Sequence, residues 1–206
     1  MPGRVFPCGW YRRHFTTRKE RASMTELAWQ EPLRGGAVAR DGFRLAAAED
    51  LALVRLQLVA GNADAEGRAE AALGAALPTT GGVVEGSTCR VAGRAPGDWL
   101  LIAGGSETAS LVQTLETALA GSTAAVTPAT DGQVALRLIG PARDRVLARG
   151  TTLDLGRLAP GQCAATRFAG VPVFLVPEAE AMLLLACRSL AVYLRDWCDA
   201  ASADCC

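Results

Sequence analysis

The sequence predicts an α+β protein with a split β-α-β (ferredoxin-like) half followed by a second strand-helix-hairpin-helix half. Three observations support this class: short runs of alternating apolar residues, amphipathic helical patterns between them, and glycine or proline turn signals at most junctions. The 206 residues can bury a sizeable core without disulfide bonds. We therefore expect one domain of moderate size or two small lobes.

The first half opens with a predicted strand at residues 51–59, LALVRLQLV. A helix is predicted over about residues 64–77, with Asp64 as its N-cap and Pro78 as the residue that ends it. The next elements are strands near residues 89–92 and 99–103, a helix from Gly105 to Gly121 and a strand at residues 124–126. This βαββαβ order is the split arrangement in which two helices cover one face of an antiparallel sheet.

The second half extends from Asp131 to Trp197 and begins with an alternating strand. Val134, Leu136 and Leu138 share one face of this strand. A short helix is then predicted between Pro141 in its first turn and Gly150, which would take a left-handed conformation at its end.

A hairpin, a strand and a helix complete the second half. Extended runs at residues 162–168 and 171–176 flank Ala169-Gly170 as a predicted hairpin, and Pro172 indicates that the second run starts at a sheet edge. A strand at residues 181–187 precedes the last helix, for which Ser189 is the predicted N-cap.

The ends of the chain differ in composition from the middle. We divide the chain into a basic leader and arm at residues 1–44, a folded α+β domain at residues 45–199 and a cysteine-bearing tail at residues 200–206. Residues 1–23 carry five Arg, the only Lys and one Glu, a net charge of +5, and their apolar residues have no helical period. We expect the leader to be disordered or partner-bound, with Met24 as an alternative start; RNA binding or a transit peptide is less favoured.

Overall composition excludes several classes of partner. The formal net charge is zero, so nucleic acid and anionic membranes are not indicated, and no apolar run is long enough for a transmembrane helix. The seven cysteines contain no C-x-x-C pair and are interpreted as free thiols of a cytoplasmic protein. Cys163 and Cys187 are expected to be buried in strands, and Cys205 and Cys206 to be exposed.

Several catalytic chemistries need residues that the predicted folded domain lacks. Nucleophilic catalysis with a histidine base needs an imidazole, and the only histidine is His14. A phosphate loop needs a lysine after its glycines, and the only lysine is Lys19. No residues have metal-ligand spacing. Acid/base chemistry stays open, since carboxylates such as Asp98 and Asp131 would have to converge.

Arginine and aromatic residues in or beside the strands point to a protein partner. An arginine in a strand or at its end often solvates an exposed face or meets another chain, and the aromatic residues are interpreted as core or interface. The candidate partner interface comprises Trp99, Arg167, Phe168, Arg188 and Tyr193.

Three motifs carry a resemblance to a known family. They are L-x-L-x-G-P at residues 136–141, P-G-x-C-A-x-T-R at residues 160–167 and R-S-L-A-x-Y-L-x-D-W at residues 188–197. The stretch from Asp98 to Trp197, about half of the chain, resembles the gamma subunit of heterotetrameric sarcosine oxidase.

The resemblance implies a fold related to the folate-binding domains of glycine-cleavage T-protein. It also implies one non-catalytic subunit among four, with alpha, beta and delta subunits as partners, chiefly alpha. Such a complex oxidatively demethylates sarcosine to glycine with O2, giving hydrogen peroxide and either formaldehyde or 5,10-methylenetetrahydrofolate. The resemblance implies that FAD, FMN, NAD and tetrahydrofolate bind to the partner subunits and that this chain binds no cofactor.

Two alternatives to this function remain. The chain would be the small subunit of a related N-methyl amino acid oxidoreductase, such as N-methylglutamate dehydrogenase, or a free-standing folate-dependent aminomethyltransferase. The second alternative needs a carboxylate that orients the folate, with Asp98 or Asp131 as candidates.

Overall fold

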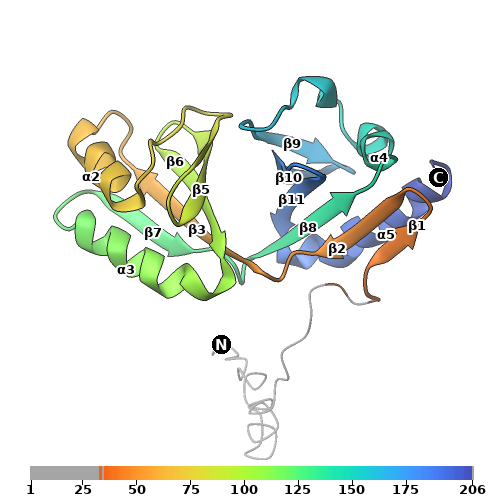
Figure 1. Cartoon of the computed structure of the whole chain (residues 1–206), viewed down its shortest axis with the longest axis horizontal. Coiled ribbons are helices and arrows are strands. Elements are labelled where there is room, and N and C mark those ends of the chain that lie inside the picture. The colour runs from red at the N-terminus through yellow and green to blue at the C-terminus, as the bar shows by residue number, and fades with distance from the viewer. Residues whose placement is uncertain (1–32, 34, 206) are drawn as a thin grey trace, which may run out of the picture. The chain divides into compact units, whose positions relative to one another are not determined.

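The computed structural model describes residue 33 and residues 35–205 (Figure 1). The predictions for the leader at residues 1–23 and for Cys206 lie outside these residues. The described chain forms two antiparallel sheets, each covered by a pair of α-helices. No helix in this part of the chain is both long and apolar enough to cross a membrane.

The first half forms a five-stranded sheet. Its strands are β3 (Leu51–Leu58), β4 (Val83–Glu85), β5 (Cys89–Ala95), β6 (Asp98–Gly104) and β7 (Ala124–Pro128). They lie in the order β4-β5-β6-β3-β7, all antiparallel. Helices α2 (Ala63–Leu73) and α3 (Thr108–Ala118) pack on one face of this sheet. The predicted split β-α-β half is therefore confirmed.

The caps of α2 differ from the prediction. Asn62, not Asp64, is the N-cap, and its side-chain oxygen accepts a hydrogen bond from the Ala65 amide at 3.2 Å. The helix ends at Leu73, before Pro78, because Gly74 takes the left-handed conformation with φ of 62°. Asp64 instead lies in the first turn, where a negative charge favours the helix dipole.

The second sheet has six strands and takes residues from both ends of the described chain. They are β1 (Val38–Arg40), β2 (Phe43–Ala47), β8 (Gln133–Ile139), β9 (Ala164–Phe168), β10 (Val171–Pro177) and β11 (Ala181–Cys187). The order is β1-β2-β8-β11-β10-β9. Helices α4 (Arg143–Gly150) and α5 (Ala191–Ala203) pack against it.

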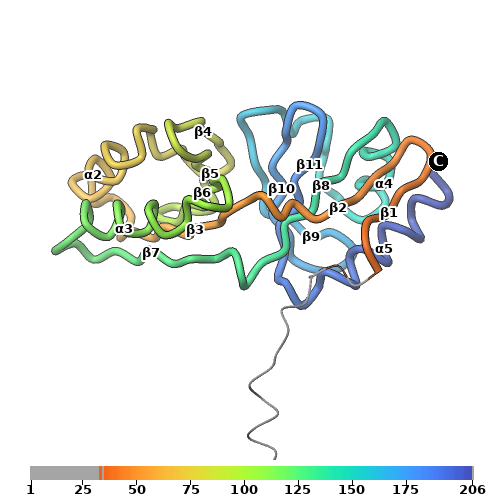
Figure 2. The backbone as a smooth tube through the Cα atoms, turned by 60° about the horizontal axis from the view of Figure 1, so that its bottom comes forward, coloured from red at the N-terminus to blue at the C-terminus, as the bar shows by residue number. Residues whose placement is uncertain are grey.

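Both predicted boundaries of the folded domain shift outward. Leu33 is buried in the core, and β1 and β2 form a hairpin around the turn Asp41-Gly42, although residues 38–44 of this hairpin lie in the predicted arm. Figure 2 shows this hairpin beside α5. At the other end, α5 continues to Ala203, and Ser202 within the predicted tail is fully buried. The sheet needs these end segments, because β2 covers the edge of β8.

The explanation predicted for Gly150 is wrong. Gly150 is the last residue of α4, and the chain leaves the helix through an extended Thr151 rather than a left-handed glycine. A Cβ at Gly150 would lie 2.6 Å from Cε2 of Phe168 and 2.8 Å from a ring carbon of Trp197. Close packing against two aromatic rings, rather than a turn, requires glycine here.

Three further local predictions are wrong. Ser189 lies in a 3-10 turn before α5, whose N-cap is Leu190 with no side-chain cap. Cys187, at the end of β11, is exposed, whereas Cys163 is buried as predicted. Cys205 is half-buried and packs against the core instead of lying in an exposed tail.

The β9-β10 hairpin has the predicted turn. Ala169 and Gly170 both have positive φ, 50° and 79°, as in the type I′ turns that suit two-residue hairpins. The outer strand is β9, but β10 pairs with β11 only from Phe174 onward. Pro172 therefore lies where β10 has no paired neighbour on that side, the position that a residue without an N–H tolerates.

A third hydrophobic cluster lies between the two sheets. It contains Leu53, Leu100 and Ile102 from the five-stranded sheet and Phe174 and Leu183 from the six-stranded sheet. Both faces of each sheet are thus covered, one by helices and one by the other sheet.

An ion-pair network connects the two sheets. Glu178, after β10, accepts hydrogen bonds from Arg90 of β5 at 2.8 Å and from Arg137 of β8 at 3.0 Å. Arg137 also donates to Asp50 at 2.7 Å, and this hydrogen bond lowers the pKa of the Asp50 carboxyl. The network fixes charged groups of β5, β8 and the segment before β3 relative to one another.

Candidate functional site: a groove beside the outer hairpin

A groove of about 620 Å³ opens beside the β9-β10 hairpin, with walls from β5 and β6 of one sheet and β8 to β11 of the other. Its volume falls within the range of roughly 300–1,000 Å³ that ligand sites occupy. The apolar lining residues are Leu100, Ala165, Pro172, Val173, Phe174, Leu185, Ala186 and Leu190. The lining also includes Gln133, Thr166 and two arginines, and it contains no carboxylate among the described residues.

Arg94 contributes a half-buried positive charge to this groove. The register of β5 and β6 shifts between Gly93 and Ala95, so Arg94 lies at an irregularity where strand alternation fails. Its guanidinium carbon lies 5.7 Å from the centroid of the Phe174 ring, a cation–π contact. Within the described residues, no carboxylate or carbonyl accepts a hydrogen bond from Arg94, so its N–H donors remain available to an anion.

Two of the five predicted interface residues are core residues. Phe168 is fully buried beneath α4 and meets Trp197 edge to face, with ring centroids 4.8 Å apart. Trp99 is 6% exposed on the helix-covered face of its sheet, and its indole N–H donates to the Pro78 carbonyl at 2.9 Å. Neither side chain is available to a partner in this fold.

The other three predicted residues lie around the hairpin and the groove. Arg167 lines the groove, and its guanidinium donates to the Gly170 carbonyl. The hydroxyl of Tyr193, on α5, donates to the Ala169 carbonyl at 2.7 Å while the side chain stays 46% exposed. The backbone N–H of Arg188 donates to the carbonyl of Gly132, another lining residue. The structure thus gathers Arg167, Arg188 and Tyr193 at one end of the six-stranded sheet.

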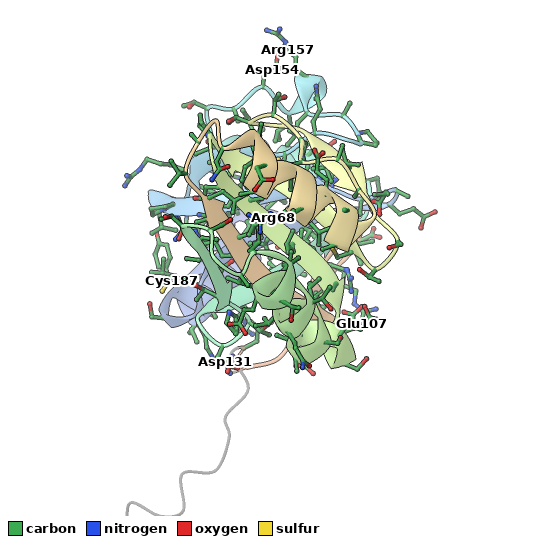
Figure 3. All side chains as sticks on the ribbon, turned by 90° about the vertical axis from the view of Figure 1, so that its left-hand side faces the viewer. Arg68, Glu107, Asp131, Asp154, Arg157 and Cys187 are labelled. Atoms are coloured by element: carbon green, nitrogen blue, oxygen red, sulfur yellow. The ribbon has the colours of Figure 1, made fainter. Side chains whose placement is uncertain are left out.

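The two candidate carboxylates do not enter the groove lining. Asp98 accepts two hydrogen bonds from Arg55, at 2.7 and 2.9 Å, which makes it a structural ion-pair residue. Asp131 is exposed in the turn before β8 (Figure 3). The described residues contain no cluster of three or more histidine, cysteine or acidic residues that would bind a metal ion.

Two groove residues were not among the predicted site residues. Arg94 lies at a strand irregularity, which no alternation pattern reveals. Cys187 lines the groove, and a hydrogen bond with the Ser189 hydroxyl lowers the pKa of its thiol. Every other residue of β11 is buried, so nothing in this apolar run distinguishes its exposed last residue in the sequence.

Comparisons with known proteins agree with this fold. A family model described as "Sarcosine oxidase, gamma subunit family" matches residues 60–204. The chain is similar in structure to heterotetrameric sarcosine oxidase from Corynebacterium sp. U-96 in complex with pyrrole 2-carboxylate. The TM-score is 0.74 and the identity 24%, over 84% of this chain and 90% of that chain. A comparison with curated proteins gives no match.

The chain is also similar to the glycine cleavage system aminomethyltransferase T from Bartonella henselae. The TM-score is 0.60 and the identity 16%, over 75% of this chain and 44% of that chain. The chain therefore spans less than half the length of the aminomethyltransferase. At these identities the two likenesses show the fold alone, and they confirm the predicted similarity of fold to glycine-cleavage T-protein. The family match covers well over half of the chain, and the chain belongs to the sarcosine oxidase gamma subunit family.

Proposed function

We propose that the chain is the non-catalytic gamma subunit of a heterotetrameric sarcosine oxidase and that it acts by holding a larger partner subunit. The family match over residues 60–204 carries this proposal. The coarser conclusion, a subunit of an oxidoreductase family, follows directly from that match.

The side chains of the folded part support a role outside the chemistry. The one imidazole of the sequence, His14, precedes the described residues, and the Asp98 carboxylate is engaged with Arg55. Apart from the Cys187 thiol, the groove offers arginine, amide and hydroxyl groups, which bind ligands more readily than they exchange protons at neutral pH.

The partners and cofactors follow from the proposed assembly. The alpha subunit is the chief partner, beside beta and delta, and FAD, FMN, NAD and tetrahydrofolate bind to those chains. The complex, in the cytoplasm, converts sarcosine, O2 and water to glycine, hydrogen peroxide and formaldehyde. When tetrahydrofolate takes the place of water, 5,10-methylenetetrahydrofolate forms in place of formaldehyde. The partner contacts this chain through Arg167, Arg188 and Tyr193.

Co-production with and without the flavin-bearing subunits tests the proposal. We expect the chain to co-elute with flavin absorbance in one complex, and the chain alone to be colourless and inactive towards sarcosine. In the assembled complex, Asp131→Asn should leave turnover per flavin unchanged. Tetrahydrofolate binding to the isolated chain in calorimetry, or a stable monomer that never binds the other subunits, would contradict it.

A further inference from the structure

The groove indicates what the partner presents to this chain. We infer that it receives an acidic, apolar segment of the partner subunit, with a carboxylate held by Arg94 and Arg167. This inference rests on the proposed function, because it specifies the contact by which the chain holds its partner.

The first argument is the unbalanced charge of the groove. Half-buried Arg90 and Arg137, on the same sheets, both donate to Glu178. Arg94 is half-buried as well, but among the described residues the one partner of its guanidinium is the face of the Phe174 ring. A partly desolvated cation without a counter-charge is costly, and a guanidinium binds a carboxylate in a two-point geometry. A partner carboxylate at this position would supply the missing counter-charge.

The second argument is the apolar surface that continues beyond the groove. Leu190 lines the groove and precedes α5, where Val192 and Tyr193 are 38% and 46% exposed. These are two of the three large hydrophobic side chains that are exposed in the described chain. A small anion would leave them in water, whereas a protein segment covers the groove and these side chains together.

The third argument excludes the basic leader of this chain as the occupant. Residues 1–23 carry a net charge of +5, and like charges across an interface oppose binding. The basic leader is therefore not the occupant, because the arginines of the groove favour an acidic segment.

Charge reversal in the reconstituted complex tests the inference. We expect Arg94→Glu to weaken binding of the chain to its partner subunits by about tenfold or more and Arg94→Gln by less, with steeper salt dependence for the wild type. Arg157→Glu is the matched control, because Arg157 is exposed in the turn at residues 155–157 and extends away from the fold (Figure 3). Its affinity should stay within about twofold of the wild type. Thermal unfolding of each variant separates a folding defect from a binding defect, and Arg167→Glu, at an exposed position, provides a second test.

A photo-crosslinking residue in place of exposed Ala165 identifies the occupant. We expect a partner peptide that contains a carboxylate, and replacement of that acid by arginine should restore binding to Arg94→Glu. Wild-type affinity in both Arg94 variants, or a crosslinked peptide without an acid, would overturn the inference while the proposed function stands. If benzoate binds the free chain through Arg94 and complex formation does not depend on Arg94, the groove is a small-molecule site and the inference is equally overturned. A wild-type chain that forms no complex contradicts the proposed function itself.

Discussion

Gly150→Ala tests the packing of α4 against β9 and α5. The new Cβ would lie 2.6 and 2.7 Å from two Phe168 ring atoms and 2.8 Å from Trp197. Phe168 is fully buried against Trp197, so the ring has little room to move. Overpacking costs about 1–3 kcal/mol, and alanine in place of glycine in a helix returns at most about 1 kcal/mol. We expect the free energy of unfolding to fall by about 1–2 kcal/mol.

Gly67→Ala provides the matched control. Gly67 lies inside α2 with no heavy atom within 4 Å of an ideal Cβ, so the same substitution should raise the free energy of unfolding by about 0.5–1 kcal/mol. Urea denaturation of the full chain, followed by circular dichroism, measures both variants. A Gly150→Ala midpoint at or above that of the wild type refutes the packing argument. Combined with Phe168→Leu, Gly150→Ala should cost less than the sum of the two single changes, because the smaller side chain relieves the clash.

Three further predictions concern charge, pH and capping. Glu178→Gln should lower the free energy of unfolding by about 2 kcal/mol, measured in urea, because Arg90 then has no acid and Arg137 keeps only Asp50; an unchanged midpoint would contradict this. Burial raises the pKa of Cys198 to about 12, so the unfolded thiol, with a pKa of about 8.5, ionises first as pH rises. Between these two pKa values the free energy of unfolding falls by up to about 1.4 kcal/mol per pH unit. Cys198→Ala should reduce this alkaline slope, and an identical slope would rule out the assignment. Asn62→Ala should lower the free energy of unfolding by about 1 kcal/mol and Asp64→Ala by less than about 0.5 kcal/mol. A larger loss for Asp64→Ala in thermal melts would show that Asp64 caps the helix instead.

Elements with local apolar patterns and turn signals were predictable from the sequence. The strand expected at residues 181–187 matches β11, and the hairpin at Ala169-Gly170 has the left-handed turn that its residues favour. The hairpin at Asp41-Gly42 carries an equally strong turn signal. The prediction of an arm missed this hairpin, because its strands of 3 and 5 residues are too short to show a clear period.

Features that depend on contacts between distant segments were not predictable. Trp99 and Leu100 point to opposite faces of β6, yet both are buried, because helices cover one face and the second sheet covers the other. Alternation therefore does not distinguish core from interface in this strand. Gly150 looks like a helix-ending glycine in sequence, and only the position of Phe168, on a strand that follows it, reveals the steric reason for it.

The placement of β1 and β2 has a consequence for biosynthesis. The five-stranded sheet is continuous in sequence and can form as soon as β7 leaves the ribosome. Strand β2, in contrast, pairs with β8 and has no neighbour on that side until β8 has been made. At about 5–20 residues per second, the roughly 90 residues between them keep the β1-β2 hairpin without its neighbour for about 5–20 seconds. During that interval its apolar residues are exposed and able to bind a chaperone or another nascent chain.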